Sequence, residues 1–135
     1  MTGSTYRILH NKNADLPKKI LEINIPILGI CYGYQWLIKN TCGKNSLSSF
    51  PKNNRRLIKR KINKPFTLPK MTYLLNHHDY ITSVPKNWNK VIKNGNQILM
   101  AYNKSKKIIG IQFHPEAVKK TRKIFFKKWI KYITK

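Results

Sequence analysis

An apolar segment that runs directly into a glycine-flanked cysteine constrains the fold of this chain more than any other feature. Residues 25–35 read IPILGICYGYQ. A short, fully apolar run is typical of a strand that is buried on both faces of a parallel sheet. Gly29 and Gly33 remove side chains that would clash in a sharp turn from strand to helix. We therefore predict a strand, a tight turn at Cys31 and then a helix, whose N-terminal dipole favours a thiolate.

A second apolar strand is predicted near the end of the chain, where residues 108–116 read IIGIQFHPE. Residues i and i+2 of an extended chain face the same side, and Pro115 keeps His114 out of helical geometry. Glu116 can therefore hold one imidazole nitrogen while the other faces Cys31. In open α/β sheets, sites form at the carboxyl ends of strands. Cys31, His114 and Glu116 thus supply the nucleophile, base and orienting group of cysteine-based acyl transfer.

Each motif taken alone also has an ordinary structural interpretation. A Gly-x-Cys-x-Gly turn occurs without catalysis, and a His-Pro-Glu segment can be a turn that caps a helix. The order Cys, His, Glu differs from the Ser, Asp, His order of the hydrolases that share such an elbow. It is the occurrence of both motifs together, each after an apolar strand, that indicates a catalytic site.

The two motifs resemble the signatures of class I (triad) glutamine amidotransferases, and most of all the glutaminase domains of GMP synthetases. A third segment, NHHDYI at residues 76–81 with Val84-Pro85 after it, is similar to the Ser-His-Gly-Asp-x-Val…Pro segment of that family. The resemblance extends over nearly the whole chain, with the motifs in family order. It implies one glutaminase domain over residues 1–135, with a three-layer α/β fold around an open, mostly parallel, flavodoxin-like sheet.

The resemblance also implies a role for individual residues of the site. Cys31 matches the nucleophile, His114 the general base and acid, and Glu116 the residue that orients the imidazole. The backbone N–H of Tyr32 matches one donor of the oxyanion hole. Gln35 matches the glutamine that contacts the amino-acid end of the substrate.

Further matches lie in two loops that the family uses for binding. The loop that binds the substrate α-amino and α-carboxylate groups corresponds to Asn76, His77, His78 and Asp79, and His78 stands where glycine is common. Gly3 is matched to the glycine loop that supplies the other oxyanion donor. Family domains begin with a strand, a helix and a second strand before that loop, whereas this sequence starts at the loop. A shortened domain without its first strands, a misplaced start codon and a fragment are all compatible with this.

The expected activity is hydrolysis of glutamine to glutamate and ammonia through a γ-glutamyl thioester, as a glutaminase of purine biosynthesis. The sequence holds no Gly-rich phosphate loop and no room for an ATP-binding domain, so we expect a separate ATP-dependent synthetase subunit of the GMP synthetase type. No cofactor or metal is expected, since His77 and His78 have no nearby cysteines. The alternatives are a γ-glutamyl hydrolase or peptidase of the same fold, and an inactive basic relative that binds a polyanion or a partner.

The charge of the chain favours that last alternative only weakly. Lysine and arginine number 28 against 4 aspartates and glutamates, a net charge of +24, which attracts polyanions. Lysine, asparagine and isoleucine, which A/T-rich codons encode, are spread over every predicted element. The clusters at 55–56 and 59–61 lack the interleaved aromatics of a base-stacking surface. We therefore expect incidental polyanion affinity at most.

The remaining features concern location and secondary structure. Without an 18-residue apolar run or a signal peptide, a soluble, cytoplasmic protein is expected. The two cysteines make no disulfide framework, and Cys42 is expected to be a spare thiol at the end of the helix after Cys31.

A helix is expected over residues 16–23 and an irregular, basic excursion or short hairpin over 41–70. Strands are expected at 71–75, 91–92, 97–102 and 107–113, with a turn at 103–106. A final amphipathic helix is predicted to bury Val118, Thr121, Phe125, Trp129 and either Tyr132 or Ile133.

Overall fold

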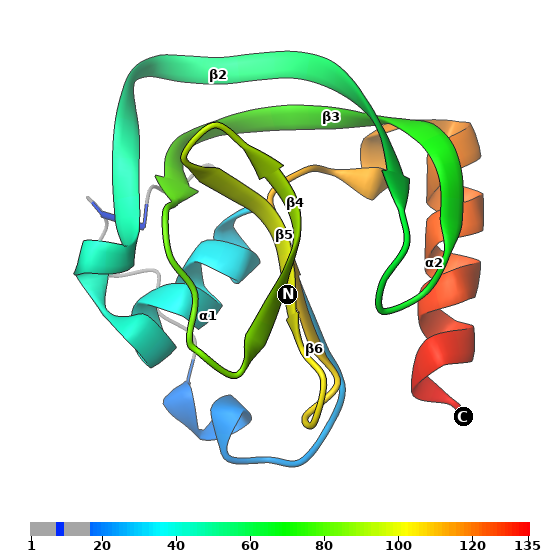
Figure 1. Cartoon of the computed structure of the whole chain (residues 1–135), viewed down its shortest axis with the longest axis horizontal. Coiled ribbons are helices and arrows are strands. Elements are labelled where there is room, and N and C mark those ends of the chain that lie inside the picture. The colour runs from blue at the N-terminus through cyan, green and yellow to red at the C-terminus, as the bar shows by residue number, and fades with distance from the viewer. Residues whose placement is uncertain (1–7, 10–16) are drawn as a thin grey trace.

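A computed structural model describes residues 8–9 and 17–135 of the chain (Figure 1). Its elements are, in order, η1 (Lys18–Leu21), β1 (Ile27–Ile30), α1 (Tyr32–Cys42), η2 (Lys44–Ser46), β2 (Leu47–Ile62), β3 (Leu68–Ile81), β4 (Trp88–Asn94), β5 (Gln97–Asn103), β6 (Ile108–Ile111), η3 (Pro115–Ala117) and α2 (Lys119–Ile133). Four strands form one sheet in the order β1-β6-β5-β4, and β2 pairs with β3 in a separate two-stranded ribbon.

The four-stranded sheet combines parallel and antiparallel pairs. β1 and β6 are parallel, with Ile30 opposite Ile111, whereas β6 with β5 and β5 with β4 are antiparallel. The α/β fold predicted from the sequence is confirmed, but over the described residues the sheet is mixed rather than mostly parallel. The reason is that short turns join β4 to β5 and β5 to β6, and a short connection can only return the chain antiparallel.

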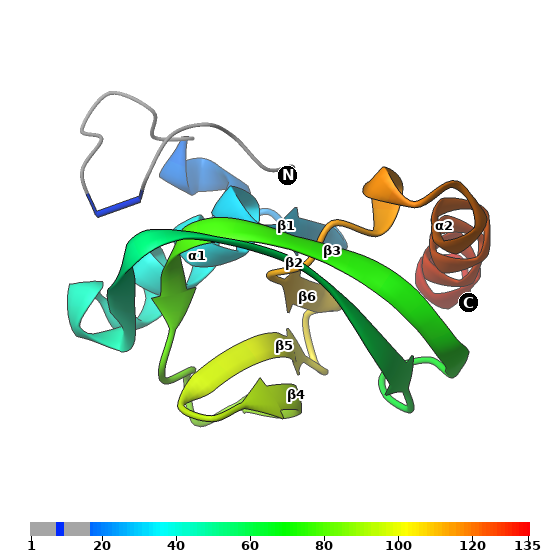
Figure 2. The same cartoon turned by 90° about the horizontal axis from the view of Figure 1, so that it is seen from above.

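The helices cover opposite sides of this sheet. Figures 1 and 2 both place α1 on one side and α2 on the other, with the β2–β3 ribbon arching across the sheet between them. Two hydrophobic clusters follow from this layering. One includes Ile27 and Ile108 together with α1, and the other includes Leu28, Ile109 and residues of β3 and α2. Successive strand residues thus alternate between two buried faces, which is why these strands are apolar throughout.

Two glycines let α1 lie close against the sheet. A Cβ atom at Gly29 would lie 2.9 Å from backbone atoms of Gly33 and Tyr34, the first turn of α1. A Cβ atom at Gly110 would lie 1.9 Å from the Tyr34 ring. The predicted tight turn from strand to helix is therefore present, and it depends on the absence of side chains in both neighbouring strands.

The segment expected to be an irregular excursion or a short hairpin is instead the first strand of a long hairpin. β2 spans 16 residues and pairs with the 14 residues of β3, which also extends beyond the expected strand 71–75. Polar, basic residues form a strand here because the backbone pairs along β3, while Ile58 and Ile62 reach the core. Tertiary pairing thus overrides the weak local preference for irregular structure.

The two ends of the chain differ in how well the sequence predicted them. The expected helix 16–23 is represented among the described residues only by the 3-10 turn η1, which buries none of its side chains and so lacks the packing that stabilises short helices. The terminal helix is present as α2, which buries Thr121, Phe125 and Trp129 as predicted. Val118 precedes the helix as its N-cap and is only half-buried, as are Tyr132 and Ile133 in the last turn, so the buried stripe is shorter than predicted. Cys42 is the last residue of α1 and its thiol is free, as expected. No helix in the described part of the chain is both long and apolar enough to cross a membrane.

Candidate active site

Cys31 occupies a strained turn between β1 and α1. Its backbone has φ 54° and ψ −105°, a conformation that is costly for a residue with a side chain. Two backbone hydrogen bonds hold it there: the N–H of Cys31 donates to the Ile111 carbonyl at 2.7 Å, and the N–H of Gln35 donates to the Cys31 carbonyl at 3.1 Å. The elbow is therefore fixed both to the neighbouring strand β6 and to the first turn of α1.

His114 and Glu116 lie just beyond the carboxyl end of β6. The N–H of His114 donates to the Leu74 carbonyl of β3 at 2.7 Å, so the imidazole is anchored between the sheet and the ribbon. Pro115 begins η3, whose turn brings Glu116 back toward the ring. The Nδ1 atom of His114 lies 2.5 Å from Glu116 Oε1. Because Nδ1 faces the carboxylate, Nε2 is the nitrogen available to the Cys31 thiol.

The electrostatics of this pair favour an imidazolium. A hydrogen bond with Cys31 and a second with Glu116 outweigh burial and raise the pKa of His114 to about 10. Burial alone would raise the pKa of Glu116, yet the hydrogen bond from His114 and a backbone N–H leave it below its ordinary value. These contacts thus favour the state in which the imidazole of His114 has taken up the proton of the Cys31 thiol and lies between sulfur and a carboxylate.

The predicted substrate loop at residues 76–79 is part of strand β3 rather than a loop. Its partner β2 carries a bulge here, since Ser49 pairs with Asp79 and Asn54 pairs with His77, leaving residues 50–53 opposite His78. In that bulge the amide of Asn53 donates to the side-chain oxygen of Asn76 at 2.6 Å. The Phe50 ring packs on His77 and Tyr80, with centroids 5.6 and 4.4 Å away.

Side chains of this stretch alternate between solvent and the interior. Asn76 is exposed, and its carbonyl faces the Cys31 thiol, which donates to it at 3.7 Å. His78 is half-buried. His77 and Asp79 are buried, and the pKa of His77 is lowered mainly by that burial.

The carboxylate of Asp79 takes part in contacts within the protein. Ser49 Oγ donates to one oxygen at 2.5 Å, and the N–H of Leu9 donates to the other at 3.3 Å. These bonds tie the ribbon and residue 9 together at the edge of the site. A role for Asp79 in substrate binding stays a prediction.

Two buried glutamines link Cys31 to β3. The amide nitrogen of Gln35 donates to the Asp79 carbonyl at 2.7 Å and to Gln112 Oε1 at 3.2 Å. The amide nitrogen of Gln112 donates to Cys31 Sγ at 3.4 Å. The sequence interpretation assigned no role to Gln112. The available signal was an amide between Ile111 and Phe113 in an otherwise apolar strand.

The two oxyanion donors predicted from the sequence differ in how they are placed. Tyr32 is the first residue of α1 and is buried beside the elbow. Gly3 lies outside the described residues. The structure therefore brings together Cys31, His114 and Glu116, with Tyr32, Gln35 and the strand 76–79 around them.

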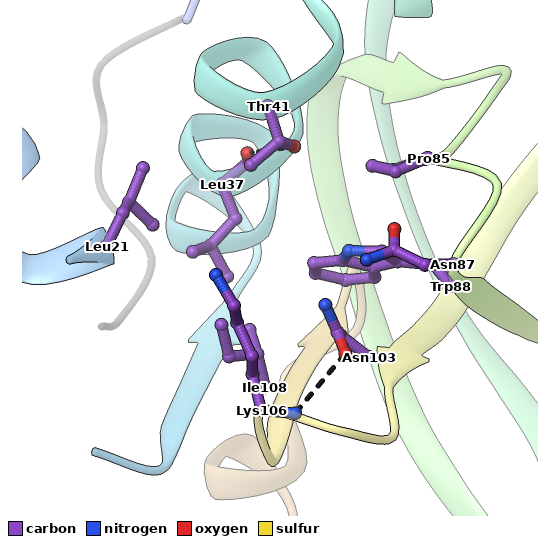
Figure 3. Close-up of a pocket in the computed structure, with 9 residues that line it drawn as sticks. All are labelled: Leu21, Leu37, Thr41, Pro85, Asn87, Trp88, Asn103, Lys106 and Ile108. Carbon is purple, nitrogen blue, oxygen red and sulfur yellow. Dashed lines mark hydrogen bonds between the residues drawn. The ribbon is translucent and has the colours of Figure 1, made fainter. Parts of the chain in front are cut away.

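A pocket elsewhere on the molecule holds none of these residues. It lies on the α1 side of the sheet (Figure 3) and is lined by Leu21, Leu37, Thr41, Pro85, Asn87, Trp88, Asn103, Lys106 and Ile108. Within residues 8–9 and 17–135, no group of three or more metal-ligating side chains is close enough to hold an ion.

Comparisons with known proteins agree with this geometry. The model of the family described as glutamine amidotransferase class-I matches residues 3–132. A glutamine-hydrolyzing GMP synthase of Caldicellulosiruptor saccharolyticus is 36% identical over 121 residues, covering 87% of this chain and 24% of the relative. The enzyme of the same name from Wigglesworthia glossinidia brevipalpis is 30% identical, covering 86% and 25%. The chain thus spans about a quarter of the length of these relatives.

Solved structures show the same fold. A Thermoplasma acidophilum protein described as a GMP synthase subunit superposes with a TM-score of 0.68 at 25% identity, covering 87% of this chain and 61% of that one. A glutamine amidotransferase from Thermotoga maritima superposes with a TM-score of 0.56 at 23% identity, covering 87% and 52%.

Proposed function

Because this chain belongs to the class I glutamine amidotransferase family, we propose that residues 1–135 form a glutaminase domain that hydrolyses glutamine to glutamate and ammonia. The observation that carries the proposal is the position of Cys31 beside His114 and Glu116. A cysteine at a strained strand–helix elbow faces an imidazole whose far nitrogen is held by a carboxylate at 2.5 Å. This is the arrangement that cysteine-based acyl transfer requires.

The reaction begins with attack of Cys31 Sγ on the side-chain amide carbon of glutamine. His114 takes the thiol proton through Nε2 and passes it to the leaving nitrogen, so that ammonia departs and a γ-glutamyl thioester remains. Water then attacks the thioester while His114 accepts a proton from it. The thiolate leaves as the tetrahedral intermediate collapses, and the imidazolium returns the proton to sulfur. Glu116 keeps the imidazole in one orientation and stabilises its charged form.

Backbone and amide groups around the elbow take the binding roles. The N–H of Tyr32 stabilises the oxyanion of each tetrahedral intermediate, and Gly3 supplies a second donor. Both amide protons of Gln35 already have acceptors, so its side-chain oxygen is the atom left to receive the substrate α-ammonium group. Asn76 is exposed and His78 is half-buried, so we assign contact with the substrate to these two side chains of the 76–79 segment.

The ammonia serves a synthetase that activates its acceptor with ATP. The names of the relatives support a partner of the GMP synthase type. A cytoplasmic location and incidental polyanion affinity stay predictions from composition.

The first test is a glutaminase assay on the native chain, the Cys31→Ala variant and a matched Cys42→Ala control. Cys31→Ala should abolish hydrolysis with an unchanged unfolding midpoint, whereas Cys42→Ala should retain activity. A glutamine-analogue electrophile should label Cys31 and spare Cys42, as read by mass spectrometry. Equal labelling of both thiols would argue against a privileged nucleophile. Hydrolysis of γ-glutamyl peptides but not of glutamine would favour a γ-glutamyl hydrolase instead.

A further inference from the structure

We propose that Gln112 is a further catalytic residue, whose side-chain amide donates a hydrogen bond to the reacting sulfur. This proposal rests on the nucleophilic role proposed for Cys31. Its Nε2 atom lies 3.4 Å from Cys31 Sγ, and the Gln112 side chain is fully buried. Gln112 directly follows β6, in the segment that leads to His114. Sulfur thus has a proton acceptor in His114 and a separate N–H donor in Gln112.

The orientation of the Gln112 amide is fixed by chemistry rather than by the shape of the site. The backbone carbonyl of Asp79 can only accept hydrogen bonds, so the group of Gln35 that lies 2.7 Å away must be its NH2. The same NH2 group faces Gln112 at 3.2 Å, so the atom of Gln112 there must be its oxygen. The NH2 group of Gln112 is therefore the end that faces Cys31.

The backbone of Gln112 is held as firmly as its side chain. Its N–H donates to the Leu99 carbonyl of β5 at 2.8 Å. A buried amide that is fixed at both ends costs little reorganisation when charge develops beside it. The N–H has its largest effect on a thiolate, because a hydrogen bond to a charged acceptor is roughly twice as strong as one to a neutral acceptor.

Gln112 therefore favours the thiolate twice in each turnover. It stabilises sulfur when the thiol proton moves to His114, and again when the thiolate leaves as the thioester is hydrolysed. Gln35 acts through Gln112, so for this effect it is a positioning residue. Asp79 takes part through its backbone carbonyl, which the sequence of the 76–79 segment does not reveal.

The test compares alkylation of Cys31 and Cys42 by iodoacetamide in the native chain and in Gln112→Met, which fills similar space without an N–H donor. At pH 7 the variant should be alkylated about tenfold more slowly at Cys31, with Cys42 unchanged as the internal reference. The pH of half-maximal alkylation at Cys31 should rise, while the limiting rate at high pH stays native. Glutamine hydrolysis should lose kcat about tenfold with KM within twofold.

Gln97→Met is the matched control, since Gln97 is also buried and its side-chain oxygen has no hydrogen-bond partner in the described part of the chain. The Gln97→Met variant should leave the rate of Cys31 alkylation and its pH dependence unchanged. If Gln112→Met does not fold, Gln35→Met tests the same bonds, because the freed Gln112 amide can then turn and Cys31 alkylation should slow.

Two results overturn the proposal: native alkylation in the variant, or a lower limiting rate with an unmoved pH profile, as expected if Gln112 only fills space. Alkylation reports on sulfur without turnover. A chain that never hydrolyses glutamine would therefore refute the glutaminase proposal while leaving the effect of Gln112 on Cys31 measurable.

Discussion

Replacing Gly110 with alanine tests how closely α1 must pack on the sheet for the elbow to form. An ideal Cβ atom at this position lies 1.9 Å from Cδ1 of the Tyr34 ring, 2.5 Å from Cε1 and 2.7 Å from Cγ. Ordinary van der Waals contact begins at 3.4 Å. The ring must therefore retreat by about 1.5 Å, the difference between 3.4 and 1.9 Å.

The Tyr34 ring has little room for such a movement. Its side chain is fully buried, and its hydroxyl donates to the Ile98 carbonyl of β5 at 3.1 Å. Overpacking a core costs about 1–3 kcal/mol, and leaving a buried hydroxyl unpaired costs about as much again. We expect Gly110→Ala to lower the free energy of unfolding by about 2–6 kcal/mol. Because Tyr34 is three residues after Cys31, a shift of α1 of about 1 Å should also reduce glutaminase activity, by up to about 10²-fold.

The assay is urea unfolding, with Gly95→Ala as the control. Gly95 has a positive φ of 60° but no atom within 4 Å of an added Cβ, so only the backbone cost of about 1–2 kcal/mol applies. A double-mutant cycle with Tyr34→Leu then isolates the clash. Alanine at position 110 should cost clearly less in the Tyr34→Leu background. An equal cost in both backgrounds, or a cost no larger than that of Gly95→Ala, would refute the packing argument.

Three further predictions follow from the site. Glu116→Gln should lower kcat less than His114→Ala, because it disturbs the orientation of the imidazole without removing the base; near-native activity of both variants would contradict the triad. The folded pKa of His114 is raised to about 10 from 6.5, so its stabilisation is complete below pH 6.5 and is lost as the pH rises through about 10. The pKa of Glu116 is lowered from 4.5, so its contribution is present above pH 4.5 and is lost on acidification. The difference in unfolding free energy between native protein and His114→Gln should therefore be largest near pH 5–6.5 and shrink on both sides; a difference independent of pH would rule this out. Finally, a synthetase partner should raise the glutaminase rate, and high salt should reduce that gain, because a chain of net charge +24 favours an acidic docking face. Full activity of the isolated chain, or a gain that salt leaves unchanged, would contradict this.

The sequence alone determined the features that depend on residues a few positions apart. Gly29, Cys31 and Gly33 lie within five residues, so the sharp elbow could be predicted from its local chemistry. His114 and Glu116 are two residues apart, and their spacing indicated the hydrogen bond that the structure contains. The apolar residues of α2 likewise repeat with the period of a helix, so the centre of its buried face could be predicted from the sequence.

The tertiary structure decided the features whose partners are far apart in the chain. The polar sequence of β2 becomes a strand only because β3 lies beside it, and the bulge at residues 50–53 depends on the register of that pairing. The contact of Gln35 with the Asp79 carbonyl spans 44 residues, and that of Gln112 with Cys31 spans 81. The role of a buried amide depends on the atoms that face it, because its donors and acceptors must pair with whatever groups the fold brings next to them. Local pattern can therefore identify a nucleophile and its base, but only the packed chain shows which amide points at the sulfur.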